Sequence, residues 1–398
     1  MGSSDTERKK NRKILGIFAT ASFLNDLGSD MIYPVWPLFI TSVLGANMAI
    51  LGFIDGLGEA IVSLAQAGSG YWSDRIRKRK IFIWTGYLMG SVSRIGYALS
   101  GIWQHLIPFR ILDRAGKIRS APRDAIIAEI STKENRGRNF GLLRAMDNLG
   151  AICGIGVCLI FFGLLGYRTL FYLAAVPSLI GVALIFFLIR ERKDADTRIY
   201  RGFSLKELNR NFKLLLILSS IFALGTFSYS FLIIYAKEFG FREERIPLLY
   251  LVFTAVASLF SLPFGRLSDK TSRKFVMILS FIFWAVVCLS IILSHNKMTI
   301  ILAFIFYGLH RGAIEPVQKT LVAELAPSAY KASSLGGFQM VTGLCALPAS
   351  LIAGILWEKT GIFVPFYFSL GLTVVACFMM MFLREEKIPS LAEAEGKW

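Results

Sequence analysis

The sequence predicts an all-α polytopic membrane protein whose twelve transmembrane helices form two pseudo-symmetric six-helix bundles. Hydrophobic residues make up 55% of the 398 residues, more than a typical soluble domain carries. One motif occurs twice, at residues 70–75 (GYWSDR) and 265–270 (GRLSDK), with a spacing of 265 − 70 = 195 residues. Glu129 and Glu324 keep this spacing, since 324 − 129 = 195. A duplication explains the repeat.

Apolar runs of roughly 20 residues, the length that crosses the hydrocarbon core of a bilayer, predict the individual spans. The first run contains Asp26 and Pro34 and has no small-residue cleavage site, which favours a retained span over a cleaved signal. We expect a tail at 1–13, one bundle at 14–190, a linker at 191–211, a second bundle at 212–384 and a tail at 385–398. The predicted spans are 14–43, 47–72, 80–101, 103–130, 139–166, 168–190, 212–240, 246–268, 274–294, 298–326, 331–359 and 362–384.

Lysine and arginine are distributed unevenly between alternate loops. The face that carries both termini has 29 of them and the opposite face has six, which predicts cytoplasmic termini for a protein of the cytoplasmic (inner) membrane. Basic loops beside anionic lipid headgroups account for the net charge of +17. We therefore expect a lipid bilayer and no nucleic acid as partner.

The reactive residue types are sparse and scattered. The five cysteines lie within apolar runs without paired ligand spacing, so we predict neither a metal site nor a disulfide framework, and no cofactor. The three histidines form no His-Glu metal motif, and no serine or cysteine has an evident base partner. The sequence therefore does not indicate an enzyme.

Charged residues at membrane depth are costly and indicate function by default. In the span 103–130, five charged residues share one face at 100° per residue, while Arg119 and Arg123 point elsewhere or follow a bend at Pro122. The alternative is a set of internal salt bridges that only join helices. The residues that we expect to line a central, substrate-binding cavity are Arg110, Asp113, Arg114, Lys117, His310, Arg311 and Glu315.

Two pairs of carboxylates stand one helical turn apart, Asp26 with Asp30 and Asp55 with Glu59. Two carboxylates so close cannot both ionise cheaply, which suits proton coupling. Alternatively, they pair with basic residues of the span 103–130 and stay ionised. The candidates for proton coupling are Asp26, Asp30, Asp55, Glu59, Asp113 and Asp147.

Six plus six spans, the basic link between them and the doubled motif resemble the major facilitator superfamily (MFS) over nearly the whole chain. More narrowly, residues 26–37, 112–128, 136–141 and 347–357 resemble a bacterial branch with mostly unassigned substrates. The resemblance implies two bundles that rock about a midplane site.

The resemblance also implies a cytoplasmic gate. Asp74 would meet the start of the span 331–359 near Ser333 and Ser334, and Asp269 would meet the start of the span 139–166, which would hold the cytoplasmic side shut. Glu129 and Glu324 would complete a charge relay that breaks when the protein opens inward. The expected gate residues are Gly70, Asp74, Arg75, Arg79, Glu129, Gly265, Asp269, Arg273 and Glu324.

These features predict a monomeric secondary transporter of a small organic solute, driven by a proton gradient. Arg110, Arg114 and Lys117 favour an anionic or zwitterionic cargo. One alternative is a multidrug exporter with an aromatic wall from the span 212–240, made of Phe222, Phe227, Tyr229 and Phe231. Another is a non-transporting membrane sensor or assembly subunit on the same fold.

Overall fold

The computed structural model describes the chain except residues 1, 77, 133–134, 191–207, 327–330 and 385–398, and the side chains of 2–8, 71, 74 and 331–333. All regular structure in the described residues is helical. The elements are α1 (Gly2–Ile32), α2 (Trp36–Leu38), η1 (Phe39–Val43), α3 (Met48–Ile76), α4 (Arg79–Leu99), α5 (Trp103–Ala115), η2 (Gly116–Arg119), α6 (Ser120–Glu129), α7 (Arg136–Leu188), α8 (Arg210–Gly225), α9 (Ser230–Glu238), η4 (Glu243–Arg245), α10 (Ile246–Lys270), α11 (Arg273–Leu293), α12 (Lys297–Leu325), α13 (Lys331–Leu344), α14 (Ala346–Thr360) and α15 (Val364–Met381).

Helices occupy every predicted span. One element, α7, covers two of them, and it bends at Gly166, whose φ of +68° suits a residue without a side chain. Within the described residues, eight helical stretches are long and apolar enough to cross a membrane. The predicted spans outside that set belong to α1, α4 and α5–α6, which carry many charged and small polar residues. The count of twelve spans stays a prediction.

Two helices are interrupted at equivalent places in the repeat. The first span loses its helix at residues 33–35, between α1 and α2, and the seventh at 226–229, between α8 and α9. Tyr33 and Ser228 lie 228 − 33 = 195 residues apart, which is the spacing of the doubled motif. Pro34 explains the first interruption. The second contains no proline.

Within the first half, α1 packs tightly against α7. A Cβ atom at Gly150 would lie 2.4 Å from the backbone oxygen of Phe23, and one at Gly154 would lie 2.2 Å from that of Leu27. These two glycines, one turn apart, therefore let the helix backbones touch, as small residues do between membrane helices.

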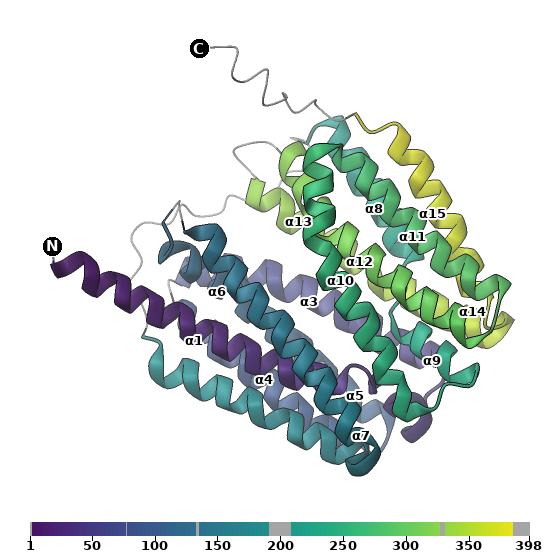
Figure 1. The fold of residues 1–398 in the computed structure, drawn as a ribbon, viewed down its shortest axis with the longest axis horizontal. Coiled ribbons are helices and arrows are strands. Elements are labelled where there is room, and N and C mark those ends of the chain that lie inside the picture. Colours follow the sequence, from purple (N-terminus) through teal and green to yellow (C-terminus); the bar gives the residue numbers. More distant parts are fainter. Residues whose placement is uncertain (1, 77, 133–134, 191–207, 327–330, 385–398) are drawn as a thin grey trace.

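The two halves, α1–α7 and α8–α15, converge near α5 and α9 (Figure 1). There α3 of the first half crosses α14 of the second, and a Cβ at Gly52 would lie 2.1 Å from the backbone oxygen of Ser350. Gly354 is equally tight against the backbone of Met48. We call this side of the molecule the closed end, because backbone-to-backbone contact leaves no passage between these two helices. The other side, which carries Arg79, Glu129 and their repeats, is the basic end.

Candidate functional site

Asp55 joins the two halves near the closed end. Its Oδ1 accepts hydrogen bonds from Arg110 Nη2 at 2.9 Å and Trp36 Nε1 at 3.0 Å. Its Oδ2 accepts from Ser228 Oγ at 2.7 Å and from the hydroxyl of Ser230, both in the other half. The four donors fill the acceptor sites of this buried carboxylate, so Asp55 forms the ion pair of the alternative interpretation.

The next turn repeats the arrangement more loosely. Arg114 lies 3.8 Å from Glu59 and 3.7 Å from Asp113, and its guanidinium covers the ring of Tyr33 at 5.2 Å. The side chain of Glu59 is 54% exposed, whereas that of Arg114 is 9% exposed. From Arg110 to Arg114, the contact with the nearest carboxylate therefore lengthens from 2.9 Å to 3.7 Å as α5 runs toward the basic end.

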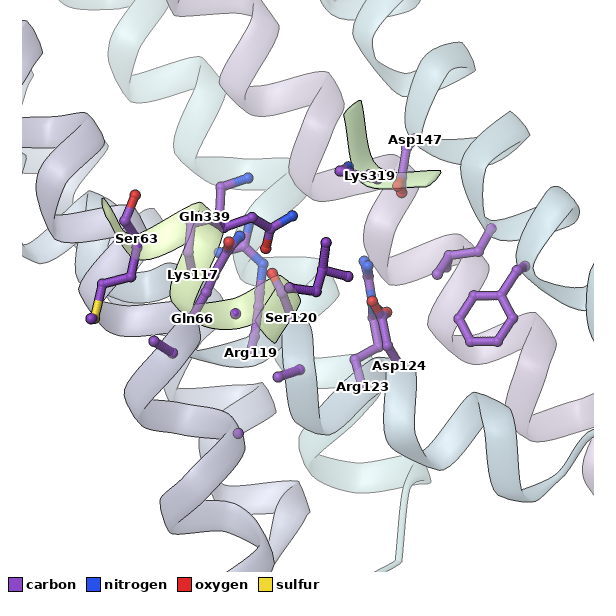
Figure 2. Close-up of a pocket in the computed structure, with 18 of the residues that line it drawn as sticks. Ser63, Gln66, Lys117, Arg119, Ser120, Arg123, Asp124, Asp147, Lys319 and Gln339 are labelled. Carbon is purple, nitrogen blue, oxygen red and sulfur yellow. The ribbon is translucent and has the colours of Figure 1, made fainter. Parts of the chain in front are cut away.

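One turn further, Lys117 reaches a cavity of about 970 Å³ between the halves, extending toward the basic end. Figure 2 shows Lys117 and Arg119 on one side of this cavity, with Lys319 and Asp147 on the other. The charged residues among its lining are Lys117, Arg119, Arg123, Arg144, Lys319, Asp26, Asp124 and Asp147.

The helix of the predicted span 103–130 changes its geometry beside the cavity, and not at Pro122, the bend that the sequence offered as one possibility. Gly116–Arg119 form a 3-10 turn, and Pro122 lies in the first turn of the following helix, where proline is tolerated. Arg119 donates to the Gly116 oxygen at 2.8 Å and covers the ring of Tyr87 at 4.9 Å. Arg123 bonds Asp124 at 3.0 Å and Ser22 at 2.9 Å.

The structure separates the residues that were predicted to line the cavity. Lys117 lines it, while Arg110, Asp113 and Arg114 lie deeper, toward the closed end. Arg311 and Glu315 form an ion pair of 3.4 Å with roughly half-exposed side chains.

His310 differs from the prediction. It is 1% exposed, and its Nδ1 hydrogen-bonds the Ser280 oxygen at 2.8 Å between the rings of Phe222 and Trp284. The histidine belongs to the core of the second half, because it lies on the side of α12 that packs on α11.

The predicted aromatic wall is also mostly core. Phe222, Phe227 and Phe231 are at most 4% exposed and pack on one another and on the rings of the second half. Tyr229 hydrogen-bonds the first half, where its hydroxyl donates to the Tyr33 oxygen at 3.1 Å.

Three proton-coupling candidates accept hydrogen bonds from neutral groups of the described residues. Asp26 accepts from Asn25 at 2.9 Å, and Asp30 accepts from the hydroxyl of Tyr250, across the halves, at 3.4 Å. Asp147 accepts from the Ser22 hydroxyl and lies 3.7 Å from Arg144. Asp26 and Asp147 line the cavity.

At the basic end, an arginine that follows the doubled motif forms a similar ion pair in each half. Arg79 of α4 pairs with Glu129 of α6, and Arg273 of α11 pairs with Glu324 of α12 at 3.1 Å. The expectation that this charge relay breaks when the protein opens inward stays a prediction. Both partners belong to one half, so they move together.

The other predicted gate residues lie in different environments. Asp269 is 66% exposed and pairs with Arg273 in its own half at 2.9 Å. Among the described residues, no hydrogen bond or ion pair joins it to the start of α7, its expected partner. Gly70 lines the cavity, and a Cβ at Gly265 would meet nothing within 4 Å. Arg75 lies at the exposed end of α3. The predicted contact of Asp74 with Ser333 involves two side chains that the structure does not describe.

Sequence reasoning did not select several residues of the cavity. Gln66 of α3 and Gln339 of α13 bring amide groups to it, and Lys319 of α12 brings an ammonium group. Lys319 carried a detectable signal, since it lies one turn beyond Glu315 on a charged span. The glutamines carried none, because an isolated amide in an apolar run is also a common packing residue.

Known proteins resemble this chain along its whole length. The sequence model of the Major Facilitator Superfamily matches residues 18–234 and 214–397. An uncharacterised MFS-type transporter of Methanocaldococcus jannaschii is 37% identical over 389 residues, 96% of each protein. Multidrug resistance protein 2 of Bacillus subtilis is 25% identical, over 95% of this chain and 97% of that one. A mutant of the nucleoside transporter NupG superimposes with a TM-score of 0.81 at 15% identity, over 94% of this chain and 100% of that chain, a likeness of fold.

Proposed function

The chain belongs to the major facilitator superfamily, and from this premise we propose that it carries a small anionic or zwitterionic organic solute by alternating access. It is an integral, multi-pass membrane protein of a transporter family. We further propose that it acts as a monomer in the cytoplasmic membrane with both termini in the cytoplasm, as the 29 basic residues on that face, against six on the opposite face, favour.

The observation that carries the proposal is the charge of the cavity. Five basic side chains line it against three acidic ones. Its volume of about 970 Å³ suits a small organic molecule. An anionic cargo would be attracted to this basic lining, and the separate acidic groups leave room for the ammonium group of a zwitterion.

The contacts at the two ends support alternating access. Those of Asp55 with Ser228 and Ser230 cross between the halves, so they must break before the closed end can open. The pairs of Arg79 and Arg273 lie within single halves and can persist throughout the cycle. We propose that Asp74 and Asp269 supply the contacts that close the basic end in the other state.

We propose that Asp26 and Asp30 carry the coupled proton. They lie one turn apart on α1, and their hydrogen-bond donors are the neutral groups of Asn25 and Tyr250. Asp55 is less suited, because a buried arginine holds it at 2.9 Å. A carboxylate with neutral partners changes its charge at lower cost than one in a buried ion pair.

A multidrug exporter is the second candidate, and the name of the Bacillus subtilis relative favours it. That relative is 25% identical along nearly the whole chain. The basic cavity and the burial of Phe222, Phe227 and Phe231 weigh against a wide aromatic site for lipophilic cations.

Transport by purified protein in liposomes tests these proposals. Radiolabelled anionic, zwitterionic and lipophilic cationic solutes are presented with and without a pH gradient. We expect flux of an anion or zwitterion that the gradient accelerates. Flux of lipophilic cations alone would establish the exporter instead, and no flux, with Asp74→Asn leaving cellular phenotypes unchanged, would favour a sensor.

A further inference from the structure

The two halves contribute very different groups to the cavity. The first half supplies four basic and three acidic side chains. Among the described lining residues, Lys319 is the one charged side chain from the second half, and Gln339 adds an amide. Lys319 is therefore the one charged contact that the described lining of the second half offers to a bound solute.

The basic residues of the cavity also differ in their own partners. Arg119 is held by the Gly116 oxygen and the Tyr87 ring, Arg123 by Asp124 and Ser22, and Arg144 by Asp147 at 3.7 Å.

For Lys117 and Lys319, no ion pair or hydrogen bond exists with any part of the chain that the structure describes. Carboxylates act on them only at longer range, from Asp26 and Asp113 on Lys117 and from Glu315 and Asp124 on Lys319. An ammonium group away from bulk water gains most from a direct anionic partner.

The two ammonium groups stand in separate parts of the cavity. In the view of Figure 2, Lys117, Gln66 and Gln339 are drawn in one part of the cavity lining and Lys319 in another. Amide N–H groups donate to carboxylate or phosphate oxygens, so the first group can satisfy several acceptors of one anion.

We propose that the substrate carries two separate anionic groups, one bound by Lys117 with Gln66 and Gln339, and the other by Lys319. This inference rests on the proposed function and narrows its substrate class to dianions with distinct charged ends. A solute held in this way bridges α5–η2 of the first half and α12 of the second. Bound substrate then draws together the halves that must close around it.

Calorimetric titration of the purified protein tests the inference. The probes are α,ω-dicarboxylates from malonate to adipate, the monocarboxylates of equal length, and tetraphenylphosphonium. We expect at least one dicarboxylate to bind about tenfold or more tightly than its matched monocarboxylate, the effect of one charge-assisted hydrogen bond. Lys117→Gln and Lys319→Gln should each remove that advantage.

Control variants separate charge from fold. Lys213→Gln removes a cation from the exposed start of α8, away from the cavity, and should leave binding unchanged. Lys117→Arg and Lys319→Arg keep the charge and should retain the preference for dicarboxylates, even if a glutamine variant fails to fold.

Two outcomes overturn the inference in different ways. Equal binding of mono- and dicarboxylates, unaffected by Lys319→Gln, rejects the second anionic group and leaves the anionic cargo standing. Binding of tetraphenylphosphonium alone, or of none of the probes, rejects the two-anion substrate and removes the support for an anionic cargo as well.

Discussion

Removal of the Ser228 hydroxyl should shift the protein toward the conformation in which the closed end opens. This hydroxyl donates to Asp55 Oδ2 at 2.7 Å across the two halves. A hydrogen bond to a charged group contributes about 1.5–3 kcal/mol. Because Asp55 keeps Arg110, Trp36 and Ser230, and water hydrates it once the halves separate, we expect the lower value for Ser228→Ala. About 1.5 kcal/mol corresponds to a roughly tenfold larger open population.

The assay uses a thiol that the closed end covers. Ser350 is 3% exposed, and its backbone oxygen would lie 2.1 Å from a Cβ at Gly52 of the other half. With the five native cysteines replaced by serine, Ser350→Cys reacts with a membrane-impermeant thiol reagent only when this contact opens. The labelling rate should rise about tenfold with Ser228→Ala, since it follows the open population.

Thr226→Ala is the matched control. It removes a hydroxyl from the same interruption between α8 and α9, but this hydroxyl donates to the Phe222 oxygen within its own half at 2.9 Å. Labelling should change less than about twofold, because no contact between the halves is lost. If Ser228→Ala also left the rate unchanged, or both variants raised it equally, the assignment of Asp55 as a link between the halves would be wrong.

Three further predictions follow from single contacts. Gly150→Ala should lower the melting temperature, because overpacking costs about 1–3 kcal/mol where the new Cβ lies 2.4 Å from the Phe23 oxygen; Gly156→Ala, with nothing within 4 Å, should not. Burial raises the pKa of Glu243, but hydrogen bonds from Lys237 and Tyr167, aided by Ser42, outweigh it and leave the pKa below its usual 4.5. The ionised form therefore stabilises this contact above about pH 4.5. The melting-temperature advantage of wild type over Glu243→Gln should shrink as the pH falls below that value. A constant difference from pH 7 downward would contradict this prediction, and the same measurement on Glu244→Gln controls for the neighbouring acid. Asp30→Asn should abolish transport driven by a pH gradient and retain solute exchange, measured in liposomes, and retained gradient-driven flux would exclude Asp30 as the proton carrier.

The fold was predictable because the length of the apolar runs and the 195-residue repeat can both be read from the sequence without knowledge of any tertiary contact. The interruption at Pro34 carries its own cause in the sequence. The matching interruption at 226–229 does not, because the groups that stabilise it belong to the other half, where Ser228 meets Asp55 and Tyr229 meets Tyr33. Tertiary contacts of this kind leave no trace in the periodicity of their own segment.

The candidate site was predictable only in part, for a similar reason. A helical projection places Arg110, Arg114 and Lys117 on one face but cannot say which of them another helix covers. Asp55 and Trp36 bury Arg110, whereas Lys117 remains at the cavity. His310 shows the converse, since its charged neighbours on α12 suggested a polar face that this residue does not share.

The residues that the two halves share, and those in which they differ, indicate where the substrate is recognised. Both halves keep the ion pair at the basic end, Arg79 with Glu129 and Arg273 with Glu324, so this device serves a motion that the halves share. The cavity breaks the symmetry, because Lys319 is the one charged residue that the described part of the second half contributes to its lining. This unequal lining fits a role in binding the solute rather than in the motion that the halves share. Substitutions at the paired sites should therefore alter the rate of transport for every solute, and those at Lys117 and Lys319 should alter which solute is carried.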